Sequence, residues 1–170
     1  TIATAFGSGA RATNTNAAAF GANAQASSTN AIAIGAGARG AYTNAIALGS
    51  NAQATFGNAT AIGLHAFANG ASATAIGVGA QAWNTNAIAI GSSAKAASYT
   101  SIAIGYNANS SSSNAVAIGQ NAQATNTDAL AFGLNAQATG ASSIALDLNT
   151  LANGANAMAL GVGATVHFTN

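Results

Sequence analysis

The sequence predicts an all-β protein, a parallel β-solenoid of twelve coils with fourteen residues in each coil. Glycine recurs at intervals of fourteen residues from Gly7 to Gly161, and Asp147 fills the one place in that series without glycine. No insertion or deletion interrupts the period, and proline, which removes a hydrogen-bond donor from a central strand, is absent. Because fourteen residues are too few for a helix and a strand with their connections, each repeat is predicted to be one flat coil.

The elements of each coil follow from the reference repeat, residues 30–43, whose positions are numbered 1 to 14 from Asn30. Positions 1–5 are predicted to form a first strand, and positions 9–13 a second strand. Asn, Ser, Thr and Gly near positions 13, 14 and 1 form one corner. Glycine at position 6, with Asn or Gly at position 8, forms the other corner, since these residues tolerate left-handed backbone angles. The corner glycines include Gly35, Gly49, Gly63, Gly77, Gly91, Gly105 and Gly119.

The two strands differ in their side-chain alternation. In the second strand, Ala at positions 9 and 11 alternates with polar residues at positions 10 and 12, which is typical of a half-buried strand. The first strand has no polar face, because Ala occupies positions 2 and 4 while positions 3 and 5 are mostly large and apolar. It is therefore predicted to be buried on both sides. Phe6, Phe20 and Phe132, at position 5, are predicted to lie in the core. The same prediction, for the core of a coil or of an oligomer, covers Ile32, Ile34, Ile46, Leu48, Ile88, Ile90, Ile102, Ile104, Val116 and Ile118.

A first strand without a polar, solvent-facing side requires a partner surface. One of its sides packs on the second strand, and no other segment of the chain is free to cover the other side. We therefore expect self-association, with the first strand facing the symmetry axis of a homo-oligomer. Short corners favour a thin coil with Ala inside and the large apolar side chains at the axis. The opposite assignment of the two sides also fits the pattern.

The composition excludes several classes of function. Charged residues are 3% of the chain, against about 25% in ordinary soluble proteins. Arg11, Arg39 and Lys95 are too few and too dispersed for contacts with nucleic-acid phosphates. Without cysteine there is no disulfide and no thiolate metal site. No apolar run is long enough to span a bilayer, so no membrane contact is predicted for this segment.

Catalytic residues are not predicted either. A Ser-His-Asp arrangement needs its base within hydrogen-bond reach of both partners. His65 and His167 fall in the fifth and twelfth coils, whereas Asp128 and Asp147 fall in the tenth and eleventh. The sequence therefore predicts a protein that is not an enzyme, without a catalytic site, a metal site or a cofactor.

Aromatic residues at corner or outward positions are the candidate surface-binding residues, since aromatic side chains dominate interface energetics. They are Tyr42, Phe56, Phe67, Trp83, Tyr99 and Tyr106, which fall between the third and eighth coils. A belt of these rings is one interpretation, and packing against neighbouring chains of an oligomer is the other.

The repeat resembles the head repeats of YadA-type trimeric autotransporter adhesins over the whole chain. The motifs are Asn-Ala-Ile-Ala-Ile-Gly at 30–35 and 86–91, Asn-Ala-Ile-Ala-Leu-Gly at 44–49, Asn-Ala-Thr-Ala-Ile-Gly at 58–63, Ser-Ile-Ala-Ile-Gly at 101–105 and Asn-Ala-Val-Ala-Ile-Gly at 114–119. The resemblance implies a left-handed β-roll and a homotrimer. It also implies a place on the extracellular side of a Gram-negative outer membrane, in a virulence-associated cell-adhesion protein with a separate stalk and anchor.

The resulting hypothesis is that residues 1–170 form one head domain, cut from a longer chain. It would attach the cell to extracellular matrix protein, glycan, other cells or abiotic surfaces. A passive spacer of a trimeric fibre is the alternative. Ice binding is a further one, although the outward rows mix Arg, Gln, Phe and Trp with Thr. Asp147 departs from the family pattern, and we expect a local distortion or a special contact in the repeat 142–155.

Overall fold

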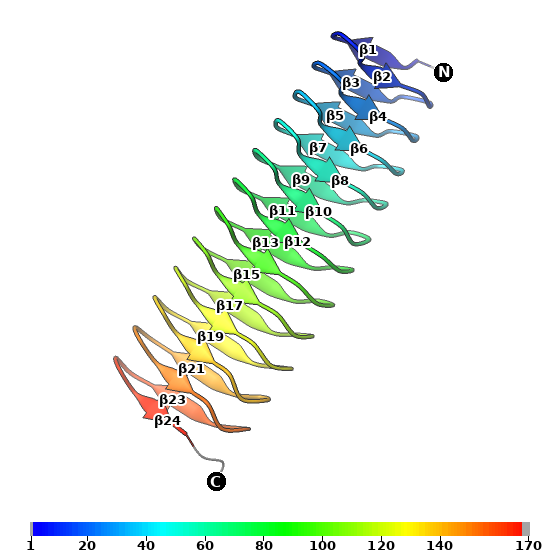
Figure 1. Ribbon diagram of the computed structural model, residues 1–170. Coiled ribbons are helices and arrows are strands. Elements are labelled where there is room, and N and C mark those ends of the chain that lie inside the picture. Colours follow the sequence, from blue (N-terminus) through cyan, green and yellow to red (C-terminus); the bar gives the residue numbers. More distant parts are fainter. Residues whose placement is uncertain (1, 168–170) are drawn as a thin grey trace.

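The computed structural model describes residues 2–167 as a stack of coils along one axis, with the described ends of the chain at opposite ends of the stack (Figure 1). Each coil contributes one strand to each of two parallel sheets of twelve strands. The first sheet contains β1 (Thr4–Phe6), β3 (Ala18–Phe20), β5 (Ile32–Ile34), β7 (Ile46–Leu48), β9 (Thr60–Ile62), β11 (Thr74–Ile76), β13 (Ile88–Ile90), β15 (Ile102–Ile104), β17 (Val116–Ile118), β19 (Leu130–Phe132), β21 (Ile144–Leu146) and β23 (Met158–Leu160).

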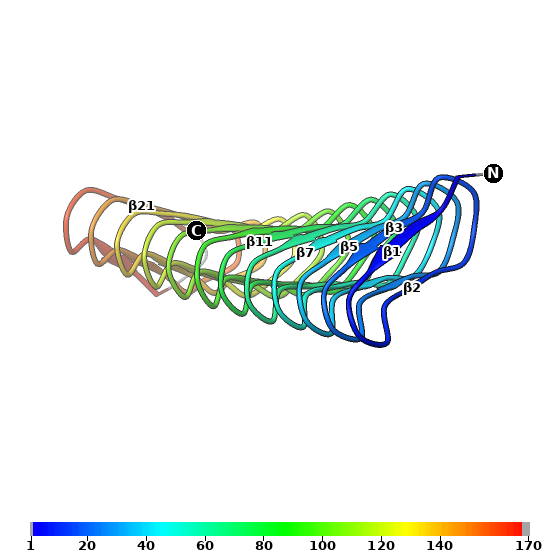
Figure 2. The same ribbon diagram turned by 90° about the horizontal axis from the view of Figure 1, so that it is seen from above.

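The second sheet lies on the other side of each coil, and the coils are flattened loops when seen from above (Figure 2). Its strands are β2 (Arg11–Ala12), β4 (Gln25–Ala26), β6 (Arg39–Gly40), β8 (Gln53–Ala54), β10 (Phe67–Ala68), β12 (Gln81–Ala82), β14 (Lys95–Ala96), β16 (Asn109–Ser110), β18 (Gln123–Ala124), β20 (Gln137–Ala138), β22 (Leu151–Ala152) and β24 (Thr165–Val166). The predicted parallel solenoid of fourteen-residue coils is confirmed.

The strands are shorter than the sequence predicts, because they cover positions 3–5 and 10–11 only. Position 1 belongs to a corner, where Asn30 and its equivalents have positive φ near 57°. Backbone hydrogen bonds still connect the coils outside the strands, as from Thr13 N–H to Ala26 O at 3.1 Å. The register is fourteen residues throughout, so that Ile32 pairs with Ile46 and identical positions form ladders along the axis.

Alanine fills the interior of the coils. Positions 2, 4, 9 and 11 point inwards, and Ala33, Ala47 and their equivalents are fully buried. The expectation that Ala lines the inside of the coil is confirmed, and the opposite assignment is wrong. Within the described residues the largest fully buried side chain is that of Thr150, so the interior is thin. At Gly40, which replaces Ala at position 11, an added Cβ would lie only 2.7 Å from the carbonyl oxygen of Ile32.

Polar residues enter this interior only where their hydroxyl groups are satisfied. Ser101, Ser110, Ser143 and Thr150 stand at alanine positions and are buried. The hydroxyl group of Ser101 donates to the carbonyl oxygen of Ser98, and that of Ser110 donates to the carbonyl oxygen of Ala115, both at 2.7 Å. A buried hydroxyl group without a partner would cost about 1–3 kcal/mol, which explains why each one reaches a nearby carbonyl.

Apart from the corner at Asp147, the corners of the coils are β-turns closed in the same way. In the third coil, Ala38 N–H donates to Gly35 O, and at the other corner Ala31 N–H donates to Ser28 O, both at 3.1 Å. The third residue of each turn has positive φ, which explains the Asn and Gly at positions 8 and 1. The position-6 glycine has φ of 129° at Gly35, and a Cβ there would lie 2.5 Å from the carbonyl of Gly49 in the next coil.

Asn side chains reinforce the corners by hydrogen bonding along the axis. At position 1, Asn30 Nδ2 donates to Asn44 Oδ1, and Asn44 Nδ2 donates to Asn58 Oδ1, both at 3.0 Å. At position 8, a second ladder begins at Asn107, which donates to Asn121. The Asn residues therefore supply both the left-handed backbone and a bond between coils.

The coil containing Asp147 is distorted, as expected. Asp147 has φ of 112°, although it carries a side chain. Its Oδ1 accepts a hydrogen bond from Leu148 N–H at 2.8 Å. Among residues 2–167, this is the one position-6 corner without the usual backbone bond to position 9. The hydroxyl group of Thr150 donates to Asp147 O instead, at 3.0 Å.

Candidate functional site

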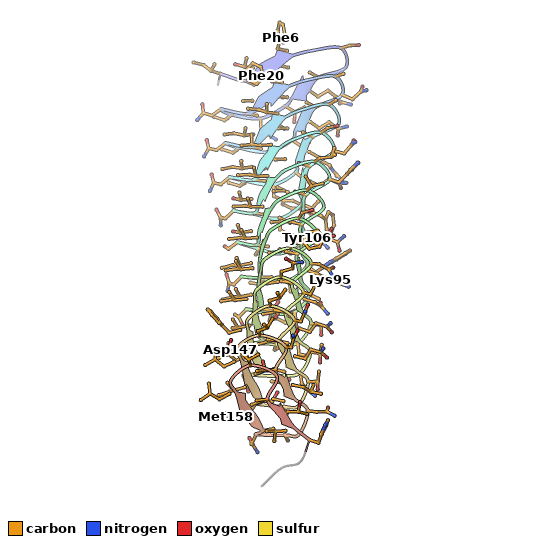
Figure 3. All side chains as sticks on the ribbon, turned by 90° about the vertical axis from the view of Figure 1, so that its left-hand side faces the viewer. Phe6, Phe20, Lys95, Tyr106, Asp147 and Met158 are labelled. Atoms are coloured by element: carbon orange, nitrogen blue, oxygen red, sulfur yellow. The ribbon has the colours of Figure 1, made fainter. Side chains whose placement is uncertain are left out.

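The side chains at positions 3 and 5 form a continuous apolar face on the outside of the first sheet. Because Ala occupies the interior, these residues point away from the coil, as Phe20 and Met158 do in Figure 3. Phe6, Phe20 and Phe132, predicted to be core, are 75%, 38% and 49% exposed in the single chain, so they lie outside the coil, on the face predicted for the oligomer axis. The reason is the thickness of the coil, which admits methyl groups but no rings.

The ten residues predicted as oligomer or coil core also lie on this apolar face. They are partly or largely exposed in the single chain: Ile32, Ile34, Ile46, Leu48, Ile88, Ile90, Ile102, Ile104, Val116 and Ile118. The first strand is therefore buried on one side only in the single chain. A row of large apolar side chains on twelve consecutive strands far exceeds the scattered exposed residues of ordinary monomers.

The outside of the second sheet has the opposite character. Position 10 points outwards there and is mostly Gln or a basic residue, including Arg11, Arg39 and Lys95. Figure 3 shows Lys95 on the side of the stack opposite to Phe20 and Met158. The two outer faces thus differ along the whole stack: one is apolar and the other is polar.

The aromatic residues pair between neighbouring coils. Tyr42 and Phe56, both at position 13, stack with ring centroids 5.8 Å apart and planes at 10°. Phe67 and Trp83, at positions 10 and 12, meet edge to face with centroids 4.9 Å apart. Trp83 Nε1 also donates to Gln81 Oε1 at 3.2 Å, which holds the indole beside the second sheet.

The six candidate aromatic residues do not form one belt. Tyr42, Phe56 and Tyr99 lie at the corner of positions 13 to 1, and Phe67 and Trp83 lie on the adjoining outer side of the second sheet. Tyr106 occupies position 7, at the opposite corner of the coil. Five rings therefore share one edge of the stack, and Tyr106 is separated from them by the width of a coil.

The remaining chemistry-bearing residues are dispersed. His65 and His167 are both exposed, and His65 supplies a left-handed corner residue with φ of 56°. Within residues 2–167 no three His, Cys, Asp or Glu side chains come together as metal ligands. The same residues contain no helix long and apolar enough to cross a membrane.

Two hollows on the outer side of the second sheet were not predicted from the sequence. One, of about 270 Å³, lies beside Ser93, Lys95 and Asn109. The other, of about 420 Å³, lies over Asn135 and Gln137, and Gln123 borders both hollows. The sequence contained one indication of these hollows, because position 8 is Asn in four of the last five coils. The positive φ at that position, however, is sufficient to explain the Asn residues there.

Comparison with known proteins gives one family. The description of that family is YadA head domain repeat, and its sequence profile matches residues 3–24, 12–38, 43–66, 68–94, 96–122, 124–146 and 152–170. No curated protein matches the chain. The matches cover nearly all of the twelve coils that the structure describes. The chain therefore belongs to the YadA head domain repeat family, the head repeats of trimeric autotransporter adhesins.

Proposed function

We propose that three copies of this chain associate through the apolar face of the first sheet and display the polar face outwards as an adhesive surface. The observation that supports the trimer is the exposure of the large residues at positions 3 and 5, where Ile34 is 43% exposed. Burying one such side chain stabilises an assembly by about 1.5–3 kcal/mol. Repetition over twelve coils makes the association strong.

The proposal includes the remaining properties of the family. The coils wind as a left-handed β-roll, and residues 1–170 form one head domain of a longer chain. The trimer lies on the extracellular side of a Gram-negative outer membrane and attaches the cell to matrix protein, glycan, other cells or abiotic surfaces, as a virulence factor. Its role is adhesive rather than enzymatic, and it uses no cofactor.

Sedimentation equilibrium at micromolar concentration tests the trimer. We expect the mass of three chains for the wild type. Replacing Ile88 and Ile90 by Lys places charges on the apolar face and is expected to yield monomers or unfolded chains. Gln81→Lys is the matched control, because position 10 on the other face already accepts Lys95. A well-folded monomer of the wild type would contradict the proposal.

The five aromatic residues on one edge are the proposed contact site for the attachment surface. Replacing Phe56, Phe67 and Trp83 by Ser is expected to reduce retention on collagen, glycan or polystyrene surfaces at least tenfold and to leave the trimer intact. The control replaces Gln25 and Gln53 by Ser, on the same outer face. Equal retention of both triple and control variants would exclude the aromatic edge as the contact.

A passive spacer is the second candidate, and the shape of the chain supports it. The stack is a rod with its described ends far apart (Figure 1). A spacer predicts that the isolated trimer is retained on none of these surfaces, although it remains folded and trimeric. The same assay therefore separates the two functions.

A further inference from the structure

We infer that the outer side of the second sheet in the seventh to twelfth coils is a binding groove for a linear, hydroxyl-rich polysaccharide. The two hollows are neighbours, because Gln123 borders both. Together they extend from Ser93 to Thr165 over five coil steps, or roughly 24 Å at about 4.8 Å per step. This site deepens the proposed attachment by naming a ligand class, and it does not depend on the aromatic edge.

One wall of the groove is the ladder at position 8. Asn107 Nδ2 donates to Asn121 Oδ1 at 3.1 Å, and Asn135 Nδ2 donates to Asn149 Oδ1 at 2.9 Å. Asn121 connects the two pairs by donating to Asn135 at 3.1 Å. The two inner amides, Asn121 and Asn135, each use one N–H and one lone pair in the ladder, so a second N–H and a second lone pair remain for a ligand.

The other wall is the row at position 10. Lys95, Asn109, Gln123 and Gln137 are register neighbours on successive strands β14, β16, β18 and β20. Within the described residues, the side chains of Gln123 and Gln137 make no hydrogen bond, whereas Asn109 Oδ1 is buried and has no partner. A buried acceptor without a donor costs stability, whereas the free amide groups of Gln123 and Gln137 are available to ligand hydroxyl groups.

This arrangement is confined to one half of the chain. In the first six coils, position 8 is Gly9, Asn23, Gly37, Asn51, His65 and Gly79, so no continuous amide wall can form. The contrast gives the chain an internal comparison, since Gln25 and Gln53 occupy the same position 10 without the facing ladder.

The chemistry of the walls selects the ligand. A carboxamide both donates and accepts, as a sugar hydroxyl does, and Lys95 is the one charged residue that borders the described groove. A linear glycan advances by close to one coil step per sugar ring, so a ring in the eighth, ninth or tenth coil can meet one amide of each wall. An extended peptide rises about 3.3 Å per residue and does not match this spacing.

A peptide also lacks its usual means of binding here. Peptides that add a strand need a free sheet edge, but the backbone of these coils is already paired, as from Gln123 N–H to Ala136 O at 2.8 Å. Proline-rich peptides dock on aromatic-lined grooves, and no aromatic residue borders either hollow. The groove faces away from the apolar face, so it stays open in the proposed trimer.

The test measures binding of the whole chain to soluble octasaccharides by calorimetry: maltooctaose, cellooctaose, the β-1,4-linked N-acetylglucosamine octamer and hyaluronan. We expect at least one uncharged probe to bind, with an affinity that changes less than twofold between low and high salt, because one lysine contributes little. Gln123→Leu with Gln137→Leu is expected to weaken binding at least tenfold. Leu151 at the next position 10 shows that this row accepts leucine.

Gln25→Leu with Gln53→Leu is the matched control and is expected to bind as the wild type does. Asn109→Leu removes the unpaired buried acceptor and is expected to raise the midpoint of thermal unfolding. If no octasaccharide binds, or if the Gln123/Gln137 variant binds as tightly as the wild type, the inference is wrong. Gelatin binding that only the groove variant loses, without any bound sugar, would assign the groove to peptide instead. Neither result changes the trimer or aromatic-edge tests.

Discussion

At the scale of single residues, the fold rests on residues that accept a left-handed backbone at two corners of each coil. Asn44 is representative, with φ of 59° and side-chain bonds to Asn30 and Asn58. The same residue thus satisfies the turn and connects three coils. This double role explains why Asn is so abundant in a chain with few charges.

Asn44→Ala and Asn44→Gly separate these two contributions. Alanine in the left-handed region costs about 1–2 kcal/mol, whereas glycine adopts it freely. We expect both variants to lose the ladder bonds, and the alanine variant to unfold at a clearly lower urea concentration than the glycine variant. Equal midpoints would mean that the ladder, and not the backbone angle, explains the choice of Asn.

Asp147 is the one residue that departs from the glycine series at position 6. A non-glycine residue at φ of 112° is strained by about 1–3 kcal/mol. Asp147→Gly is therefore expected to raise the midpoint of thermal unfolding, followed by circular dichroism. Gly133→Asp introduces the same side chain one coil earlier, where a Cβ lies 2.5 Å from the Asp147 carbonyl, and is expected to lower it. A lower midpoint for Asp147→Gly would show that Asp147 makes a stabilising contact.

At the scale of the strand, the distance between the two sheets determines which side chains point inwards. Ala89 and Ile90 are neighbours on β13, yet Ala89 is fully buried and Ile90 is half-buried on the outer face. Alternation along a strand sends successive side chains to opposite faces. Alanine inside and isoleucine outside is thus the reverse of an ordinary globular sheet.

Ala89→Val and Ile90→Val test this reversal. Adding two carbons inside a thin, filled interior is expected to destabilise the chain by about 1–3 kcal/mol. Ile90→Val removes one methyl group from the outer face. It should lower the stability of the single chain little and weaken the trimer modestly. Urea unfolding and sedimentation of both variants distinguish the two effects. Equal loss of stability would indicate that Ile90 is as buried as Ala89 within the coil.

At the scale of the whole molecule, each coil contacts only its two neighbours, as in other solenoids. The two corners are also alike, so each coil approximates two halves of seven residues with alanines in the same places. The halves differ mainly in their outward residues. Which sheet carries the apolar face therefore depends on the register of the outward residues and not on the alanine interior.

Deleting residues 86–99 removes one complete coil and preserves the register. We expect a folded trimer that is shorter by about 4.8 Å, measured by small-angle scattering. Deleting residues 86–92 removes half a coil instead. The alanines stay inside, but the apolar row after the deletion moves to the opposite sheet, so β-structure should persist and the trimer should be lost. A half-coil deletion that still forms trimers would contradict the role of the apolar face.

The strict fourteen-residue repeat was sufficient to predict the coil, its period and the parallel register, because it leaves one way to stack identical units. It also predicted the glycine corners and the disturbance at Asp147, since these depend on local backbone angles. The strands were predicted too long, because residues such as Asn30 fit either a strand or a turn by composition. The positive φ of Asn30 in the folded chain places it in the turn.

The separation of the two sheets, which is a property of the folded stack, determines which residues the coil encloses. The short corners favoured alanine inside the coil, but the opposite assignment also fitted the sequence pattern. The separation of the sheets decides between them, because the interior holds alanine with a few Ser and Thr residues. The amide groove likewise arises from rows that lie two residues apart in sequence and face each other only after stacking. The period belongs to one coil, whereas the separation of the sheets and the facing of the rows at positions 8 and 10 arise only when the coils are stacked.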